Sequence, residues 1–290
     1  MSDQTGAGDA KRPVAFVTGA SRGIGKATAI DLADAGFDVA VAARTMTDGD
    51  GRSDGVAIPG GLDTTAARIA EAGVEAFPIV MNLMDRASVL AAVQQVYDHF
   101  GRIDVMVNNA VYQGPGGNAL FLDLTEEMVH DVFEGNVFAQ LAILHEVVPR
   151  MLAAGGGTIV NMISGTAYTD PPAKSGEGGW GMAYAMSKAA FGRVTPLLHV
   201  EHGAEGLRLF SIDPGFTLTE RMVATSAGDQ YTQHFTPATP DVIGRAIRWL
   251  CTDVGDPDGA DGLRGQVVLA QREVKRRGLL PGWPSPAARD

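Results

Sequence analysis

The sequence has a single cysteine. Cys251 is the only one among 290 residues, which excludes an intrachain disulfide. It ends an apolar run with Leu250, so we predict a packed thiol at the end of a helix rather than a nucleophile. No cluster of cysteine and histidine has the spacing of a structural zinc site. We interpret the pair His199 and His202 as surface histidines and expect no metal site.

Basic residues are outnumbered by acidic ones. Lys and Arg total 23 against 34 Asp and Glu, giving a formal net charge of -11. Nucleic-acid binding usually needs a basic face, so this balance argues against a nucleic-acid partner. The run 275–277 is the main basic cluster near the C-terminus, and we interpret it as a solvated face rather than a binding patch.

Long apolar runs are missing as well. No stretch reaches the roughly 18 apolar residues that a spanning helix needs, so no membrane partner is expected. The N-terminal segment MSDQTGAGDAKRP has no apolar core of a secretory signal. We therefore expect a cytoplasmic protein.

The sequence does contain a regular alternation of β-like and helical patterns. Hydrophobic residues make up 45% of the chain, enough for a large core. Seven apolar runs suit strands: Pro13–Thr18, Phe37–Ala43, Glu75–Met81, Ile103–Val107, Gly157–Ile163, Leu207–Ile212 and Gly265–Ala270. Helical patterns occupy Gly23–Ala35, Thr64–Ala72, Arg86–Phe100, Thr125–Ala153, Gly181–Gly203 with a kink at Pro196, and Pro240–Cys251. The alternation predicts an α/β fold, a Rossmann-type doubly wound parallel sheet of about seven strands.

We expect one domain with two tails. No change in composition divides the chain, and no internal repeat is visible. Residues 1–12 are polar and predicted to be an N-terminal tail, residues 13–278 the domain, and the proline-rich residues 279–290 a C-terminal tail. Residues 45–63 are predicted to form a long loop.

A glycine-rich loop joins the first predicted strand to the first helix. It reads TGASRGIG over residues 18–25. Glycines allow a tight turn and let the backbone approach a pyrophosphate, which then lies at the helix N-terminus. A plain turn is the alternative, but the position between strand and helix is the one that nucleotide binding requires.

The spacing of these glycines resembles that of the classical short-chain dehydrogenase/reductase family. Further motifs follow in the family's order over residues 14 to about 270, with Val111 in place of a glycine. They are Asn108-Asn109-Ala110, Asn136, Ser164, Tyr184 with Lys188, and Pro214-Gly215 with Thr219. The resemblance implies the catalytic residues Asn136, Ser164, Tyr184 and Lys188.

Tyr184 is the expected catalytic acid and base. It lies four residues before Lys188 on a predicted helix, so both share one face. The lysine ammonium and the positive nicotinamide ring should lower the phenol pKa. Tyr184 could then exchange a proton with the substrate oxygen, which Ser164 would hold. The resemblance implies that Asn136 anchors a water linking Lys188 to solvent.

The cofactor is expected to be NADP(H), with NAD(H) less favoured. Ala43 stands where NAD-binding members carry an acidic residue, so no carboxylate repels a 2′-phosphate. Arg44 and Arg22 could bind that phosphate with charge-assisted hydrogen bonds, although both could be ordinary surface residues. An amide, Asn82, replaces the family's aspartate near the adenine. The expected cofactor-binding residues are Gly19, Ser21, Arg22, Gly23, Ile24, Gly25, Arg44, Asn82, Leu83, Asn109, Ala110, Tyr184, Lys188, Pro214, Gly215, Thr217 and Thr219.

Three segments depart from the family pattern. Ser164 and Tyr184 are unusually far apart, and the extra residues 169–181 could either shape the substrate pocket or form a surface excursion. The loop 45–63 is longer than usual. The last strand ends in Ala-Gln-Arg at 270–272, where the family often has Asp-Gly-Gly, which puts the family's C-terminal contacts in doubt.

These observations predict an NADP(H)-dependent oxidoreductase that acts on a carbonyl or secondary alcohol. A non-catalytic NADP-binding regulator and the same chemistry with NAD are the alternatives. The segment 216–239 should form the substrate lid, and its apolar side chains either line a pocket or pack on the body. They are Phe216, Met222, Tyr231 and Phe235.

A homodimer or homotetramer is also expected. The predicted helix 125–153 carries more apolar residues than we expect one sheet face to cover, and related helices pair between subunits in the family. These residues are Leu141, Ile143, Leu144, Val147 and Val148.

Overall fold

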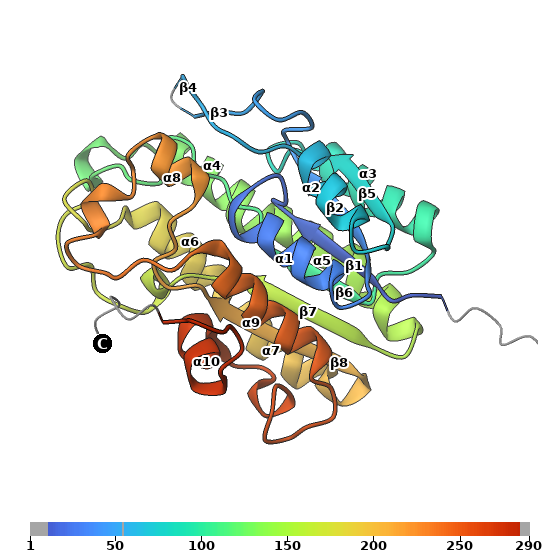
Figure 1. The fold of residues 1–290 in the computed structure, drawn as a ribbon. Helices are drawn as coiled ribbons and strands as arrows, with labels where there is room; N and C mark the ends of the chain where they lie inside the picture. The colour runs from blue at the N-terminus through green and yellow to red at the C-terminus, as the bar shows by residue number, and fades with distance from the viewer. Residues whose placement is uncertain (1–10, 54, 285–290) are drawn as a thin grey trace, which may run out of the picture.

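The computed structural model describes residues 11–53 and 55–284. Within these residues, seven parallel strands form the main sheet in the order β5-β2-β1-β6-β7-β8-β9 (Figure 1). The strands are β1 (Val14–Thr18), β2 (Asp38–Ala43), β5 (Ala76–Val80), β6 (Val105–Asn108), β7 (Gly157–Met162), β8 (Leu207–Asp213) and β9 (Val267–Leu269). The predicted fold class and number of strands are confirmed.

Helices cover both faces of the sheet (Figure 1). One face carries α1 (Gly23–Ala33), α2 (Leu62–Ala70), α9 (Pro240–Thr252) and α10 (Ala270–Arg277). The other carries α3 (Arg86–Phe100), α4 (Glu126–Phe133), α5 (Ala139–Ala153), α6 (Met182–Gly192) and α7 (Val194–His202). A short helix, α8 (Glu220–Ala224), belongs to the segment between β8 and α9.

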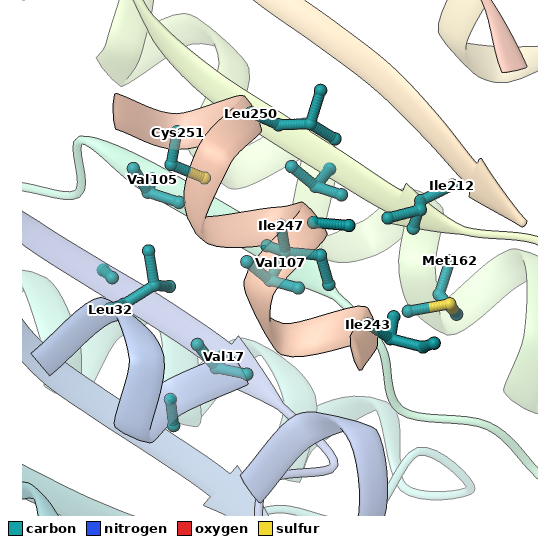
Figure 2. Close-up of a cluster of buried hydrophobic side chains, with 14 of the residues drawn as sticks. Val17, Leu32, Val105, Val107, Met162, Ile212, Ile243, Ile247, Leu250 and Cys251 are labelled. Atoms are coloured by element: carbon teal, nitrogen blue, oxygen red, sulfur yellow. The ribbon is translucent and has the colours of Figure 1, made fainter. Parts of the chain in front are cut away.

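The strands are apolar on both sides because both faces are buried. In β1, Val17 points into the core beneath α1 and α9, and Phe16 into the core beneath α3 and α5. Figure 2 shows the first core, where Cys251 lies among aliphatic side chains at the end of α9. Cys251 is buried, as predicted, and burial raises its thiol pKa to about 12, so it is not a reactive thiolate.

The strand order reverses between β1 and β6. The chain builds β2 and β5 outward from β1 on one side, and then β6 to β9 on the other. In open α/β sheets, ligands bind beyond the carboxyl ends of the strands at such a reversal. The glycine loop follows β1 and the Asn-Asn-Ala segment follows β6, so both lie at this point.

Two predicted helices are interrupted. The helix 125–153 is divided by a π-helical segment, Glu134–Phe138, that contains Asn136. Such segments widen one turn and often occur at functional sites. The helix 181–203 breaks at Arg193 rather than at Pro196. Pro196 lies in the first turn of α7, where a missing N–H is tolerated.

The prediction that the helix 125–153 has more apolar side chains than the rest of the chain can cover is wrong for most of the five residues named for it. Only Leu141 keeps a partly exposed side chain. The other four are at most 9% exposed and fill the core against the sheet and α3: Ile143, Leu144, Val147 and Val148. The sheet face and α3 together cover more of this helix than the sequence pattern indicated.

The loop 45–63 and the C-terminus also differ from expectation. The loop contains a small hairpin, β3 (Arg52–Ser53) with β4 (Val56–Ala57). After β9 the chain forms α10, which the sequence pattern did not predict. Leu280 and Trp283 then pack, partly buried, against the core. The chain therefore stays packed beyond residue 278, where the domain was predicted to end. Of the two predicted tails, residues 1–10 and 285–290 lie outside the described residues. In the described part of the chain, no helix is long and apolar enough to cross a membrane.

Candidate active site

The glycine loop forms a cradle that only glycine can build. Gly19 and Gly23 have φ values of 69° and 57°, in the left-handed region that favours glycine. A Cβ at Gly25 would lie 2.3 Å from the carbonyl oxygen of Gly19. The cradle opens at the N-terminus of α1, where backbone N–H groups without an acceptor inside the helix attract anions, and the Glu220 carboxylate accepts from the first of them, Gly23 N–H, at 2.8 Å. This geometry fits a pyrophosphate.

The segment after β6 braces this cradle. The Asn109 side chain donates to the carbonyl oxygen of Thr18 at 2.8 Å. The Thr18 hydroxyl accepts from the backbone N–H groups of Asn109 and Ala110, each at 3.1 Å. Thr18, which the sequence reasoning did not single out, thus joins the two strand ends. Its position one residue before Gly19 was the only available signal.

The second strand ends beside two arginines. Ala43 is 8% exposed, and Arg44 after it is exposed. Arg22 donates to the carbonyl oxygens of Pro59 at 2.9 Å and Gly60 at 2.6 Å. Its pKa is lowered, chiefly by burial, with the charge of Arg44 contributing in the same direction. The charges of Glu220 and Asp48 act on this pKa in the opposite direction, so acidic groups already lie near Arg22, while position 43 carries no charge that would repel a phosphate group.

The predicted adenine-side residues form a turn after β5. The Asn82 side-chain oxygen accepts from Met84 N–H at 3.2 Å, while Asn82 N–H donates to the Ser88 hydroxyl at 3.1 Å. Leu83 is buried. Asn82 therefore shapes the turn, and its amide nitrogen can still serve as a donor.

Ser164, Tyr184 and Lys188 meet at the carboxyl end of β7. Ser164 ends this strand region and caps a short 3-10 helix, Gly165–Ala167, by accepting from Thr166 N–H at 3.3 Å. Tyr184 and Lys188 lie on α6, and the Tyr184 phenol is near enough to the Ser164 side chain for that side chain to lower the phenol pKa. The Lys188 ammonium donates to the carbonyl oxygen of Met162 at 2.8 Å and lies 5.9 Å from the centre of the Tyr184 ring.

The expected lowering of the Tyr184 pKa does not occur in the free protein. Burial raises this pKa to about 12, the Ser164 side chain opposes the rise, and the charges of Tyr231 and Asp213 add to it. Burial lowers the pKa of Lys188 to about 8. The Tyr184 pKa is raised rather than lowered because a buried phenolate is costly and because the Lys188 ammonium bonds a carbonyl oxygen instead of the phenol. The expectation also relied on a positive nicotinamide ring, which is not part of the free protein.

Asn136 connects the π-helical segment to the tyrosine-bearing helix. Its side-chain oxygen accepts from Tyr112 N–H at 2.8 Å, and its amide donates to the Ser187 hydroxyl at 3.2 Å. Ser187 in turn donates to the carbonyl oxygen of Tyr184 at 2.8 Å. The structure thus places the four predicted catalytic residues in one region. Asn136 holds the backbone, and its expected water stays a prediction.

Comparison with protein families agrees with this geometry. Residues 13–230 match the family model described as short chain dehydrogenase. The chain belongs to the short-chain dehydrogenase family. Members of this family are oxidoreductases of alcohol and carbonyl groups, and the chain is an enzyme of this class.

Similar proteins include short-chain dehydrogenases of several kinds. The short chain dehydrogenase tazN of Aspergillus terreus is 32% identical over 242 residues, which are 81% of this chain but only 48% of that protein. The 3-oxoacyl-[acyl-carrier-protein] reductase FabG of Staphylococcus aureus is 29% identical over 73% of this chain and 77% of its own length. The structure of L-sorbose reductase from Gluconobacter frateurii, complexed with NADPH and L-sorbose, superposes with a TM-score of 0.73. It is 25% identical and covers 89% of this chain and 95% of that chain.

The segment after β8 lies over the glycine loop of this short-chain dehydrogenase. Gly215 has a φ of 62° and begins a turn in which the Thr217 hydroxyl donates to the carbonyl oxygen of Pro214 at 3.3 Å. Thr219 begins α8 and approaches Gly23. The predicted Pro214, Gly215, Thr217 and Thr219 therefore lie between the catalytic residues and the cradle.

Gln271 holds this turn and was missed by the sequence reasoning. Its side-chain amide donates to the carbonyl oxygens of Pro214 at 2.9 Å and Phe216 at 3.1 Å. Gln271 lies in α10, the helix that replaces the family's Asp-Gly-Gly ending. The departure noted in the sequence thus supplies a support for the turn after β8, and no local pattern could have revealed a contact across 57 residues.

The extra residues 169–181 contact both neighbouring segments. The Ser175 hydroxyl donates to the carbonyl oxygen of Asn118 at 2.7 Å, in the loop before α4. Gly178 N–H donates to the Gln230 side chain at 3.3 Å, in the lid. In the lid, Phe216 packs against Tyr231 and Phe235 with ring centres 5.7 and 6.5 Å apart. The insertion therefore links the loop before α4 to the segment 216–239.

Proposed function

We propose that this enzyme transfers a hydride between NADP(H) and a carbonyl or secondary alcohol. One observation carries the proposal. Ser164, Tyr184 and Lys188 lie together beyond the strand ends, on the same edge of the sheet as the glycine cradle. A hydride donor bound in the cradle and extending across this edge would bring its reactive ring to the serine and tyrosine.

Each residue has a distinct task in the proposed reaction. The bound cofactor supplies or accepts the hydride. In the reductive direction, Tyr184 donates its proton to the carbonyl oxygen, and Ser164 holds that oxygen by a hydrogen bond. With a pKa raised to about 12, the Tyr184 phenol carries its proton at neutral pH but is a weaker acid than a free phenol, so donation depends on stabilisation of the phenolate. Lys188 provides the positive charge that stabilises the phenolate left behind.

The proposed cofactor is NADP(H) rather than NAD(H). Ala43 carries no charge to repel a 2′-phosphate, while Arg44 is exposed beside it and Arg22 lies within electrostatic reach of Arg44. Arginine suits phosphate recognition because its planar donors match phosphate oxygens. That L-sorbose reductase binds NADPH is consistent with this choice.

Replacing Tyr184 tests the proposed function. Tyr184→Phe keeps the ring but removes the proton donor, so turnover of any ketone substrate with NADPH should fall about a hundredfold or more. NADPH binding, followed by fluorescence titration, should persist. Tyr97→Phe is a matched control because it removes a buried phenol hydroxyl on α3. Near wild-type turnover of Tyr184→Phe would contradict the assigned role, and absence of turnover in the wild type across a ketone and alcohol panel would favour a non-catalytic regulator.

A further inference from the structure

A second polar pair, Tyr168 and Asp213, lies beside the catalytic residues. Strands β7 and β8 are paired so that Met162 lies opposite Ile212. Ser164 and Asp213 therefore leave adjacent strands at the same edge of the sheet. The Tyr168 hydroxyl donates to Asp213 Oδ2, and Gly215 N–H donates to Asp213 Oδ1 at 2.9 Å. The pair thus joins the serine loop to the turn that follows β8.

Asp213 is buried without a cationic partner. Asp213 is 7% exposed, and none of the ion pairs found among the described residues joins it to a lysine or arginine. Both carboxylate oxygens of Asp213 instead accept from neutral donors, the Tyr168 hydroxyl and Gly215 N–H. Asp213 also lies close to the residue that follows Ser164. A Cβ added at Gly165 would lie only 3.2 Å from Asp213 Oδ2, so the glycine allows the carboxylate to approach the backbone there.

Tyr168 combines an anchored hydroxyl with an exposed ring. The residue is 53% exposed, and its pKa is raised by burial of the hydroxyl, by the hydrogen bond to Asp213 and by the charge of Asp213. The phenol therefore stays protonated, and its only proton is committed to the carboxylate. A hydroxyl has one donor and two acceptor positions, so the remaining capacity of Tyr168 is that of an acceptor.

Tyr168 belongs to the same loop as Ser164. Ser164, which would hold the substrate oxygen, is four residues earlier on the same short loop, and Thr169 fastens that loop by donating to the carbonyl oxygen of Gly165 at 2.7 Å. The charge of Asp213 also acts on the Tyr184 phenol. The pair and the catalytic residues therefore share one region, bordered by the insertion 169–181.

We propose that Tyr168, positioned by Asp213, determines specificity by accepting a hydrogen bond from a hydroxyl group next to the substrate carbonyl. The substrate class is then an α-hydroxyketone, or a vicinal diol in the oxidative direction. A ketone without this hydroxyl leaves the polarised phenol oxygen without its partner, and sites built to bond a hydroxyl discriminate strongly against analogues that lack it. This inference rests on the proposed reductase function.

Two matched substrates test the inference. With saturating NADPH, kcat/KM is measured for 3-hydroxy-2-butanone and for 2-butanone, which differ in one hydroxyl. The wild type should prefer the hydroxyketone. Tyr168→Phe should lower kcat/KM for the hydroxyketone about tenfold, the effect of roughly one hydrogen bond, and should change that for 2-butanone about twofold or less. Tyr97→Phe should leave the ratio of the two constants unchanged.

Asp213→Asn serves as the second variant. It keeps the size of the side chain but removes the charge that orients Tyr168, so the preference for the hydroxyketone should fall in the same direction as in Tyr168→Phe. Equal losses for both substrates in both variants would mean that the pair only supports the loop, and would overturn the inference. A wild type that does not distinguish the two ketones would also overturn it. Turnover of neither ketone, nor of any other carbonyl compound, would instead refute the proposed function.

Discussion

At the scale of single residues, the catalytic group is held in a protonation state set by burial. The Tyr184 pKa is raised to about 12 and the Lys188 pKa is lowered to about 8, so each neutral form is favoured. A cationic ring nearby would favour the phenolate and oppose the effect of burial on Tyr184. Tyr184 therefore carries its proton at neutral pH, and a nearby positive charge would be needed to make the phenolate accessible.

Lys188 should make the free energy of unfolding depend on pH between about 8 and 10.5. Its folded pKa lies below its unfolded value, so in this window the unfolded chain binds more protons and stability rises with pH. Below about 8 the cost of burying the ammonium is fully present. Compared with Lys188→Met, the wild type should therefore gain thermal stability from pH 8 to 10.5. Melting curves of both proteins check this, with the exposed Lys174→Met as control, and a difference that stays constant with pH would contradict it.

Arg44 should distinguish the two nicotinamide cofactors. Arg44→Ala is expected to weaken NADPH binding by about 1.5–3 kcal/mol, the range for a hydrogen bond to a charged group, and to leave NADH binding nearly unchanged. Titration of both cofactors measures the effect. Arg68→Ala, an exposed arginine on α2 paired with Glu71, is the control. Equal losses for NADPH and NADH would mean that Arg44 does not meet the 2′-phosphate.

At the scale of elements, the loop 45–63 and the lid are tied to the glycine loop. Arg22 donates to the carbonyl oxygens of Pro59 and Gly60 in the loop, and Arg221 of α8 donates to the Ser53 hydroxyl at 3.1 Å. Glu220 of α8 accepts from Gly23 N–H at 2.8 Å. A carboxylate thus lies at the N-terminus of α1, where a phosphate group is expected.

Removing the charge of Glu220 should strengthen cofactor binding. A carboxylate at a helix N-terminus gains about 0.3–1 kcal/mol from the backbone charges there. A pyrophosphate has to compete with this interaction, so Glu220→Gln should tighten NADPH binding about two- to fivefold. Fluorescence titration measures the change, and Asp229→Asn, elsewhere in the lid, is the matched control. Weaker NADPH binding in Glu220→Gln would show instead that Glu220 holds the lid closed over the cofactor.

At the scale of the whole molecule, an apolar groove remains between α3 and α5. It is lined by Leu90, Phe138, Leu141, Ala142 and His145, with Arg86 and Glu146 at its border. Phe138 is 46% and Leu90 39% exposed. Although most of the helix 139–153 is buried within one chain, this groove leaves apolar surface of the kind that subunit contacts cover.

The groove should lie in a two-fold interface. Light scattering at micromolar concentration is expected to give at least twice the chain mass of 30.3 kDa. Leu141→Glu places a charge in the groove and should lower the mass toward that of one chain. Val254→Glu, exposed in the loop after α9, should not change the assembly. A wild type of single-chain mass would refute the interface.

Local patterns predicted most of the architecture. Strands buried on both faces produce apolar runs of recognisable length, and α3 was predicted with its observed bounds, Arg86–Phe100. The interruption at Asn136 was not visible, because a single widened turn of five residues is too short to show a period of its own within a long helical pattern. Helix α10 was missed because its composition is strongly polar, and it is fixed by packing against α9 and the core.

The sequence by itself determined the alternation of the seven strands with the main helices, the glycine cradle and the shared helix face of Tyr184 and Lys188, while Ser164 was assigned from the resemblance to the family. These depend on residues close together along the chain, where spacing dictates geometry. Only the tertiary structure decided which distant groups meet. Tyr168 and Asp213 are 45 residues apart, and Gly23 and Glu220 are 197 apart. Such pairs leave no periodic pattern, because their contact arises from the folding of the sheet edge and not from the local chain.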